Sequence, residues 1–114
     1  MIPAPYNLPT GYRGDSYKQI TFFLTNVSGS GIYIDGASGA AQVKNKRGQV
    51  ALEWLTSDDS MLISGNSVTL KAKCGDQMRV NPDIYLWDLE VSSGCLTNTY
   101  LSGEFKIIED ITEI

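Results

Sequence analysis

The sequence contains no histidine among its 114 residues. Histidine is the commonest general base and the commonest metal ligand, so its absence removes the usual candidate for both roles. Four serines have a glycine nearby, and none of them has an imidazole to activate it as a nucleophile. They are Ser28, Ser30, Ser64 and Ser67. We therefore expect no metal site and no cofactor.

Cysteine is also scarce. The two cysteines, Cys74 and Cys95, lie 21 positions apart and form no CxxC pair. Two thiols alone do not complete the four ligands of a structural zinc site. Their spacing permits a disulfide, but a chain without an export signal favours free, reduced thiols.

Long runs of one character are missing as well. No apolar run approaches the ~18 residues that cross a bilayer, and the first residues lack the basic start and apolar stretch of a secretory signal. We expect the protein to stay where it is made or to leave by lysis. The net charge is −4, and the one basic cluster, Lys44, Lys46 and Arg47, has no aromatic residue beside it. Nucleic-acid binding, which needs a broad basic face, is therefore set aside.

What the chain does contain is short apolar–polar alternation. The clearest such segments predict strands over 18–25, 40–46, 50–55, 68–73 and 84–91. Shorter strands are expected over 32–34 and 61–63, and the last segments over 95–101 and 103–108. About seven to eight short strands at intervals of ~8–12 residues indicate an all-β, antiparallel sandwich or barrel. Only residues 75–83 break the rhythm, and there we expect one helical turn with Met78 and Val80 as apolar contacts.

The first eleven residues hold three of the four prolines. We predict that residues 1–11 form an extended arm without a core of its own, in front of a single domain over 12–114. Such an arm can lie along a neighbour's sheet, so we expect it to become ordered only on assembly. The residues expected to bind a partner are Pro3, Pro5, Tyr6, Leu8 and Tyr12.

Two carboxylates on one strand raise the question of catalysis. In YLWDLEV, residues 85–91, Asp88 and Glu90 share one face, roughly 7 Å apart along the backbone. That spacing suits a glycosidase pair, but a chain this small has little material for a cleft. A solvated sheet face explains the acids better, with Lys71, Lys73 and Lys106 expected to point outward on other strands and pair with them. We predict that the protein is not an enzyme.

Three further patterns have simple structural explanations. Arg13-Gly14-Asp15 spells an adhesion tripeptide, but Gly14 is expected to form a turn. Asp58 and Asp59, which could help to hold calcium, lack the spaced ligands of a calcium loop and predict a turn as well. Trp54 and Trp87 are expected to anchor the core between two sheets, although one of them at a rim could be an interface residue.

Several motifs occur in an order that resembles small structural proteins of tailed bacteriophages. They are Tyr12-Arg13-Gly14-Asp15-Ser16, the alternating strand 20–25, DGASGAAQV over 35–43, YLWDLE over 85–90 and LSGEFKIIEDIT over 101–112. This order resembles the N-terminal β-sandwich domain of upper baseplate proteins. The sequence departs from the usual pattern at residues 35–39 and in the shortened segment 75–83.

The resemblance implies an immunoglobulin-like β-sandwich with a role in attachment. We expect a non-enzymatic virion protein of the tail or baseplate, assembled in the host cytoplasm and docked in several symmetric copies to other virion proteins. A capsid or neck decoration protein of the same fold is the first alternative. The second is a receptor- or carbohydrate-binding module that uses Tyr17, Tyr33 or Tyr100.

Overall fold

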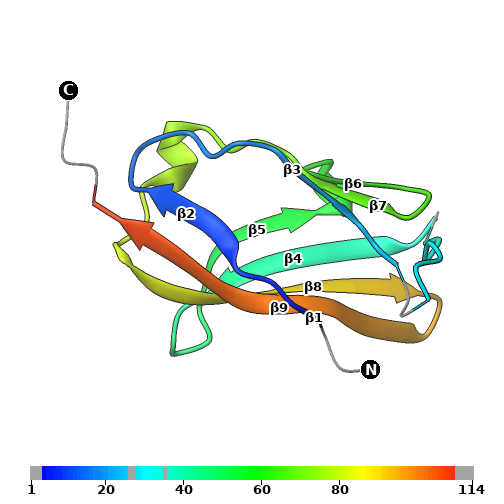
Figure 1. The fold of residues 1–114 in the computed structure, drawn as a ribbon. Helices are drawn as coiled ribbons and strands as arrows, with labels where there is room; N and C mark the ends of the chain where they lie inside the picture. The colour runs from blue at the N-terminus through cyan, green and yellow to red at the C-terminus, as the bar shows by residue number, and fades with distance from the viewer. Residues whose placement is uncertain (1–3, 26–27, 35, 110–114) are drawn as a thin grey trace.

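The structure is a computed structural model, and it describes residues 4–25, 28–34 and 36–109. Two β-sheets pack face to face (Figure 1). The larger sheet contains β1 (Ala4–Pro5), β2 (Leu8–Tyr12), β4 (Ser38–Lys44), β5 (Val50–Leu55), β8 (Asp83–Ser93) and β9 (Leu96–Ile108). The smaller sheet contains β3 (Ile20–Phe23), β6 (Met61–Ser64) and β7 (Ser67–Leu70). The prediction of an all-β, immunoglobulin-like sandwich is confirmed.

The order of the strands follows an immunoglobulin-like plan. In the larger sheet it is β1-β9-β8-β4-β5, with β2 also paired to β9, and in the smaller sheet it is β3-β7-β6. All pairs are antiparallel except those that β1 and β2 make with β9, which are parallel. Two short 3-10 turns complete the chain, η1 (Thr56–Asp58) and η2 (Gly75–Met78). In the described part of the chain, no helix has the length and apolar character that crossing a bilayer requires.

Strand alternation builds the core as the sequence predicted. On β8, Tyr85, Trp87, Leu89 and Val91 are buried, because successive side chains of a strand point to opposite faces. Trp54 on β5 is fully buried, so both tryptophans anchor the space between the sheets. The expected helical turn is present as η2, and its Met78 is fully buried.

Two aromatic features lie where immunoglobulin domains have characteristic residues. The hydroxyl of Tyr85 donates to the backbone oxygen of Asn81 at 2.5 Å, near the start of β8. This arrangement is that of a tyrosine corner. Two residues later, where such domains have a cysteine of the inter-sheet disulfide, Trp87 stacks on Phe22 of β3, with ring centroids 5.8 Å apart. An aromatic stack therefore joins the two sheets at this position.

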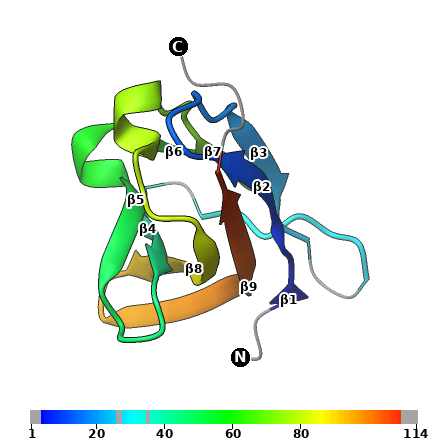
Figure 2. The same cartoon turned by 90° about the vertical axis from the view of Figure 1, so that its left-hand side faces the viewer.

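The arm differs from its prediction. Residues 4–5 and 8–12 are strands paired with β9 of the same chain, and Leu8 is buried in the core. Figure 2 shows β1 and β2 beside β9, on the side of the sandwich that also carries β3. Residues 4–5 and 8–12 therefore belong to the larger sheet, and Leu8 belongs to the common core, so this part of the arm is not separate from the domain. That the arm becomes ordered only on assembly stays a prediction. Leu8 joins the core and the ring of Tyr6 packs on Phe22, which the sequence pattern did not reveal.

Three smaller expectations also change. Lys73 does not point outward but is buried. Residues 32–34 are not a strand; Ile32 and Ile34 instead donate backbone hydrogen bonds to Leu24 and Gly65. The segments 95–101 and 103–108 form one long strand, β9, with a register shift opposite Leu89 and Glu90.

Candidate functional site

The described residues among the five predicted to bind a partner differ in exposure. Pro3 lies outside the described residues. Pro5 and Tyr12 are exposed on β1 and β2, whereas Leu8 packs into the core of its own chain. Tyr6, between the two strands, is exposed on one side only. A partner role for these residues remains a prediction, and the contacts that the structure gives to Tyr6 and Leu8 are internal.

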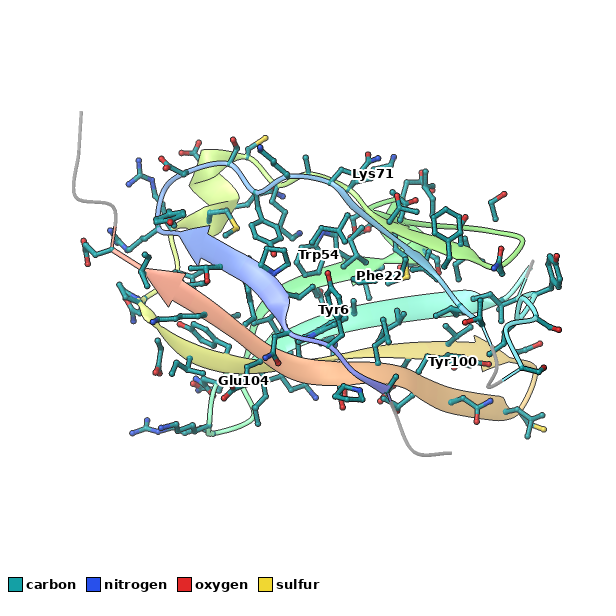
Figure 3. All side chains as sticks on the ribbon, viewed as in Figure 1. Tyr6, Phe22, Trp54, Lys71, Tyr100 and Glu104 are labelled. Atoms are coloured by element: carbon teal, nitrogen blue, oxygen red, sulfur yellow. The ribbon has the colours of Figure 1, made fainter. Side chains whose placement is uncertain are left out.

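Tyr6 is fixed to the sandwich by backbone and ring contacts. Its backbone N–H donates to the oxygen of Ser102 at 2.9 Å, and its own oxygen accepts from Trp87 Nε1 at 2.7 Å. Its ring packs edge-on against Phe22, with centroids 5.1 Å apart (Figure 3). Gly103 permits this approach, because a Cβ atom at that position would overlap the Tyr6 oxygen.

Asp88 and Glu90 lie on the outer face of the larger sheet, as the sequence predicted. Within residues 4–25, 28–34 and 36–109, neither acid forms an ion pair with a lysine. Asp88 lines an open groove of about 600 Å³, whereas Glu90 does not. The groove runs along β4, β8 and β9 and is also lined by Gln42, Lys44, Asn45, Lys46, Gly48, Leu86, Ser102 and Glu104.

The buried titratable groups serve the packing of the fold. Lys73 Nζ donates to the backbone oxygen of Glu53 at 2.8 Å and lies 4.8 Å from the centroid of the Trp54 ring. Burial lowers the pKa of Lys73. The hydroxyl of Tyr17 donates to the backbone oxygen of Pro9 at 2.7 Å, and burial raises the pKa of Tyr17. These contacts link separate segments of the chain, and they explain why both residues are buried without a catalytic role.

The two polar motifs form turns. Gly14 has a φ of 86°, the left-handed conformation that glycine adopts at little cost. The Asp58 carboxylate accepts from both the backbone N–H and the hydroxyl of Ser60, and these hydrogen bonds lower the pKa of Asp58. Cys74 and Cys95 are both exposed and free.

The outer face of the smaller sheet differs in composition from the outer face of the larger sheet. Its register aligns two outward rows, Thr21–Thr69–Leu62 and Phe23–Ser67–Ser64. We call these six residues the small-sheet face. Phe23 is 70% exposed and Leu62 is 46% exposed.

The two outer faces of the sandwich differ in the number of charged residues on their strands. None of the six residues of the small-sheet face is charged, and neither is any other residue of β3, β6 or β7. The outer face of the larger sheet carries six charged residues on its strands, Lys44, Glu53, Asp88, Glu90, Glu104 and Lys106. Protein-contact surfaces are commonly poor in charged residues and rich in aromatic residues, and the small-sheet face combines a lack of charge with the exposed ring of Phe23.

Sequence reasoning missed the small-sheet face. Alternation places Thr21 and Phe23 on the same side of the predicted strand 18–25, but it does not align that strand with β6 and β7. The available signal was the lack of charge over three separate segments, 20–23, 61–64 and 67–70. Which segments are neighbours is set by tertiary pairing, so the combined face becomes visible only in the fold.

The tyrosines considered for sugar binding are separated. Tyr17 is buried, Tyr33 is highly exposed beside Gly65, and Tyr100 is half-buried on β9. Figure 3 shows Tyr100 on the long β9 strand, in the sheet opposite the one that contains β7. The structure does not bring these three rings together on one rim.

Comparisons with known proteins do not identify a family or an activity for this chain. No protein-family model matches the chain, and no curated protein matches it. A solved structure, described as a family 123 glycoside hydrolase from Clostridium perfringens in work on glycolipid glycan hydrolysis, is similar over 96% of this chain. The identity is 12% and the TM-score 0.37, and the chain spans 24% of that protein's length. A similarity of this size gives no information on the activity of the present chain.

Proposed function

We propose that this protein is a non-enzymatic structural component of a tailed-bacteriophage virion, placed in the tail or baseplate and assembled through protein–protein contacts. The order of motifs over residues 12–112, which resembles the N-terminal domain of upper baseplate proteins, supports the virion assignment. The small-sheet face supports assembly by contact.

The small-sheet face is the observation on which the proposal depends most. A phenylalanine that is 70% exposed on a sheet face leaves most of its ring in water, at a cost of roughly 25 cal/mol for each Å² of apolar area. A neighbouring subunit would remove that area from water. The hydroxyls around the ring can donate or accept, so they can be satisfied across an interface as well as by water.

The same surface suits a capsid or neck position, because a scaffold of this kind is not tied to one place in a particle. Genes for tail sheath or baseplate proteins beside the coding sequence would favour the tail, and genes for the portal or major shell protein would favour the capsid or neck.

Purified particles test the virion assignment. Phage particles from an induced lysate of the encoding strain, banded by density, should contain this chain in several copies per particle when measured by quantitative mass spectrometry. A chain that is expressed but found only in the soluble fraction would contradict the proposal.

A further inference from the structure

The small-sheet face has two properties that restrict which partner it fits. It carries no charge, and its apolar side chains stand at opposite corners, with Phe23 on edge strand β3 and Leu62 on edge strand β6. The central strand β7 contributes only the hydroxyl residues Ser67 and Thr69 to this face.

The lack of charge allows a second copy of this chain to approach the small-sheet face. Each copy has a net charge of −4, so two copies repel each other through most of their surface. A face without charge is where like-charged copies approach at the lowest electrostatic cost. A partner of opposite charge would instead be attracted to the charged face of the larger sheet.

The hydrogen-bonding groups of the small-sheet face also suit a second copy of this chain. A symmetric interface places the same patch on both subunits, so its polar groups must be able to pair with themselves. Lysine offers only donors and ionised glutamate only acceptors, whereas a hydroxyl offers both. The four polar residues of the small-sheet face are all hydroxyl residues, and Thr21 and Thr69 already pair with each other at 3.1 Å.

We propose that two copies of this chain dimerise through the small-sheet face about a two-fold axis, with Phe23 of each copy packed on Leu62 of the other. With the axis across the diagonal that joins Phe23 to Leu62, both apolar corners are buried against apolar side chains, and hydroxyl groups lie opposite hydroxyl groups. The inference rests on the proposed function only in taking this face as the contact surface.

Sedimentation equilibrium of the purified full chain, from micromolar to millimolar concentration, tests the dimer. The wild type should associate to a dimer, and Phe23→Glu and Leu62→Lys should each lose the dimer. Leu86→Glu is the matched control, because Leu86 is 59% exposed on the outer face of the other sheet. It should dimerise as the wild type does.

A mixture of the two variants tests the pairing itself. In a mixed dimer, the carboxylate introduced by Phe23→Glu in one copy would face the ammonium group introduced by Leu62→Lys in the other. The second contact of that dimer would keep the original Phe23 and Leu62. An equimolar mixture should therefore regain the dimer that each variant has lost.

Three results would overturn the inference: a monomeric wild type, a dimeric Phe23→Glu variant, or a mixture that stays monomeric. If Phe23→Glu does not fold, the wild type and a folded Leu62→Lys variant still decide the question.

The dimer and the virion assignment can fail separately. A wild type that is monomeric in solution but present in particles would overturn the dimer and leave the proposed function standing. A dimer whose chain is absent from particles would do the reverse.

Discussion

Trp87 and Tyr6 are joined by a hydrogen bond across 81 positions of sequence, from the indole Nε1 to the backbone oxygen, at 2.7 Å. This bond ties the arm to β8, a central strand of the larger sheet. It depends on Gly103, the residue of β9 that pairs with Trp87 and over which the arm crosses.

Gly103→Ala is expected to displace the arm, because the new Cβ would overlap the Tyr6 oxygen. Overpacking of this kind costs about 1–3 kcal/mol. Urea unfolding should show that loss, and amide exchange should show faster exchange at the Tyr6 N–H. Gly48→Ala is the control: Gly48 has a φ of 82° with open space around it, so the variant should lose stability through backbone strain alone. Unchanged exchange at Tyr6 in Gly103→Ala would contradict this account of the arm.

The stack of Phe22 on Trp87 should appear as a coupling energy. In a double-mutant cycle with Phe22→Leu and Trp87→Leu, we expect about 0.5–1.5 kcal/mol of interaction beyond the sum of the single effects. A cycle of Phe22→Leu with Ile84→Ala should be additive within about 0.5 kcal/mol, since Ile84 is exposed on β8 and points away from the core. Equal coupling energies in both cycles would contradict a specific stabilisation by the stack of Phe22 on Trp87.

The tyrosine corner predicts a difference between two tyrosines. Tyr85→Phe loses the hydrogen bond to Asn81 and should lower the free energy of unfolding by about 1 kcal/mol. Tyr33→Phe changes an exposed side chain and should stay within about 0.5 kcal/mol of the wild type. Thermal and urea unfolding of the two variants would check this, and a larger effect at Tyr33 would count against the assignment.

Alkaline pH should weaken the fold in part through Tyr17. Burial raises its pKa in the folded chain, whereas an unfolded tyrosine ionises near pH 10. The unfolded chain therefore loses its proton first, so the contribution of Tyr17 is full below about pH 10 and is lost as the pH rises above that value.

Tyr17→Phe should consequently show a smaller loss of stability between about pH 8 and about pH 11 than the wild type. It should not abolish the loss, because burial also raises the pKa of Tyr85. At neutral pH, the variant should be less stable by about 1 kcal/mol, since the hydrogen bond to Pro9 is missing. An identical alkaline loss in both proteins would show that Tyr17 ionises normally in the fold.

Local pattern was sufficient to predict much of the fold. The alternation in YLWDLEV predicted which side of β8 is buried, and the positions of Trp54 and Trp87 in the core followed from the same rule. One helical turn was predicted within residues 75–83 because that segment fits no strand period, and the structure has it at Gly75–Met78. These features are local, since a strand's period and a turn's composition lie within a few residues.

Features that depend on distant segments were not predictable in the same way. Alternation placed Lys73 outward, but beyond the end of β7 its side chain turns onto Trp54 and the Glu53 oxygen instead. The prolines near the N-terminus suggested a free arm, whereas β9 offers parallel pairing and Trp87 a hydrogen bond 81 positions away. The small-sheet face likewise depends on the register of three separate strands.

The central claim is that this chain is a building block that acts by contact through the small-sheet face. The most direct measurement is the number of copies in particles from a strain that lacks the wild-type gene and expresses either Phe23→Glu or Leu86→Glu. The account predicts wild-type numbers for Leu86→Glu and few or none for folded Phe23→Glu. Equal incorporation of the two variants would contradict it.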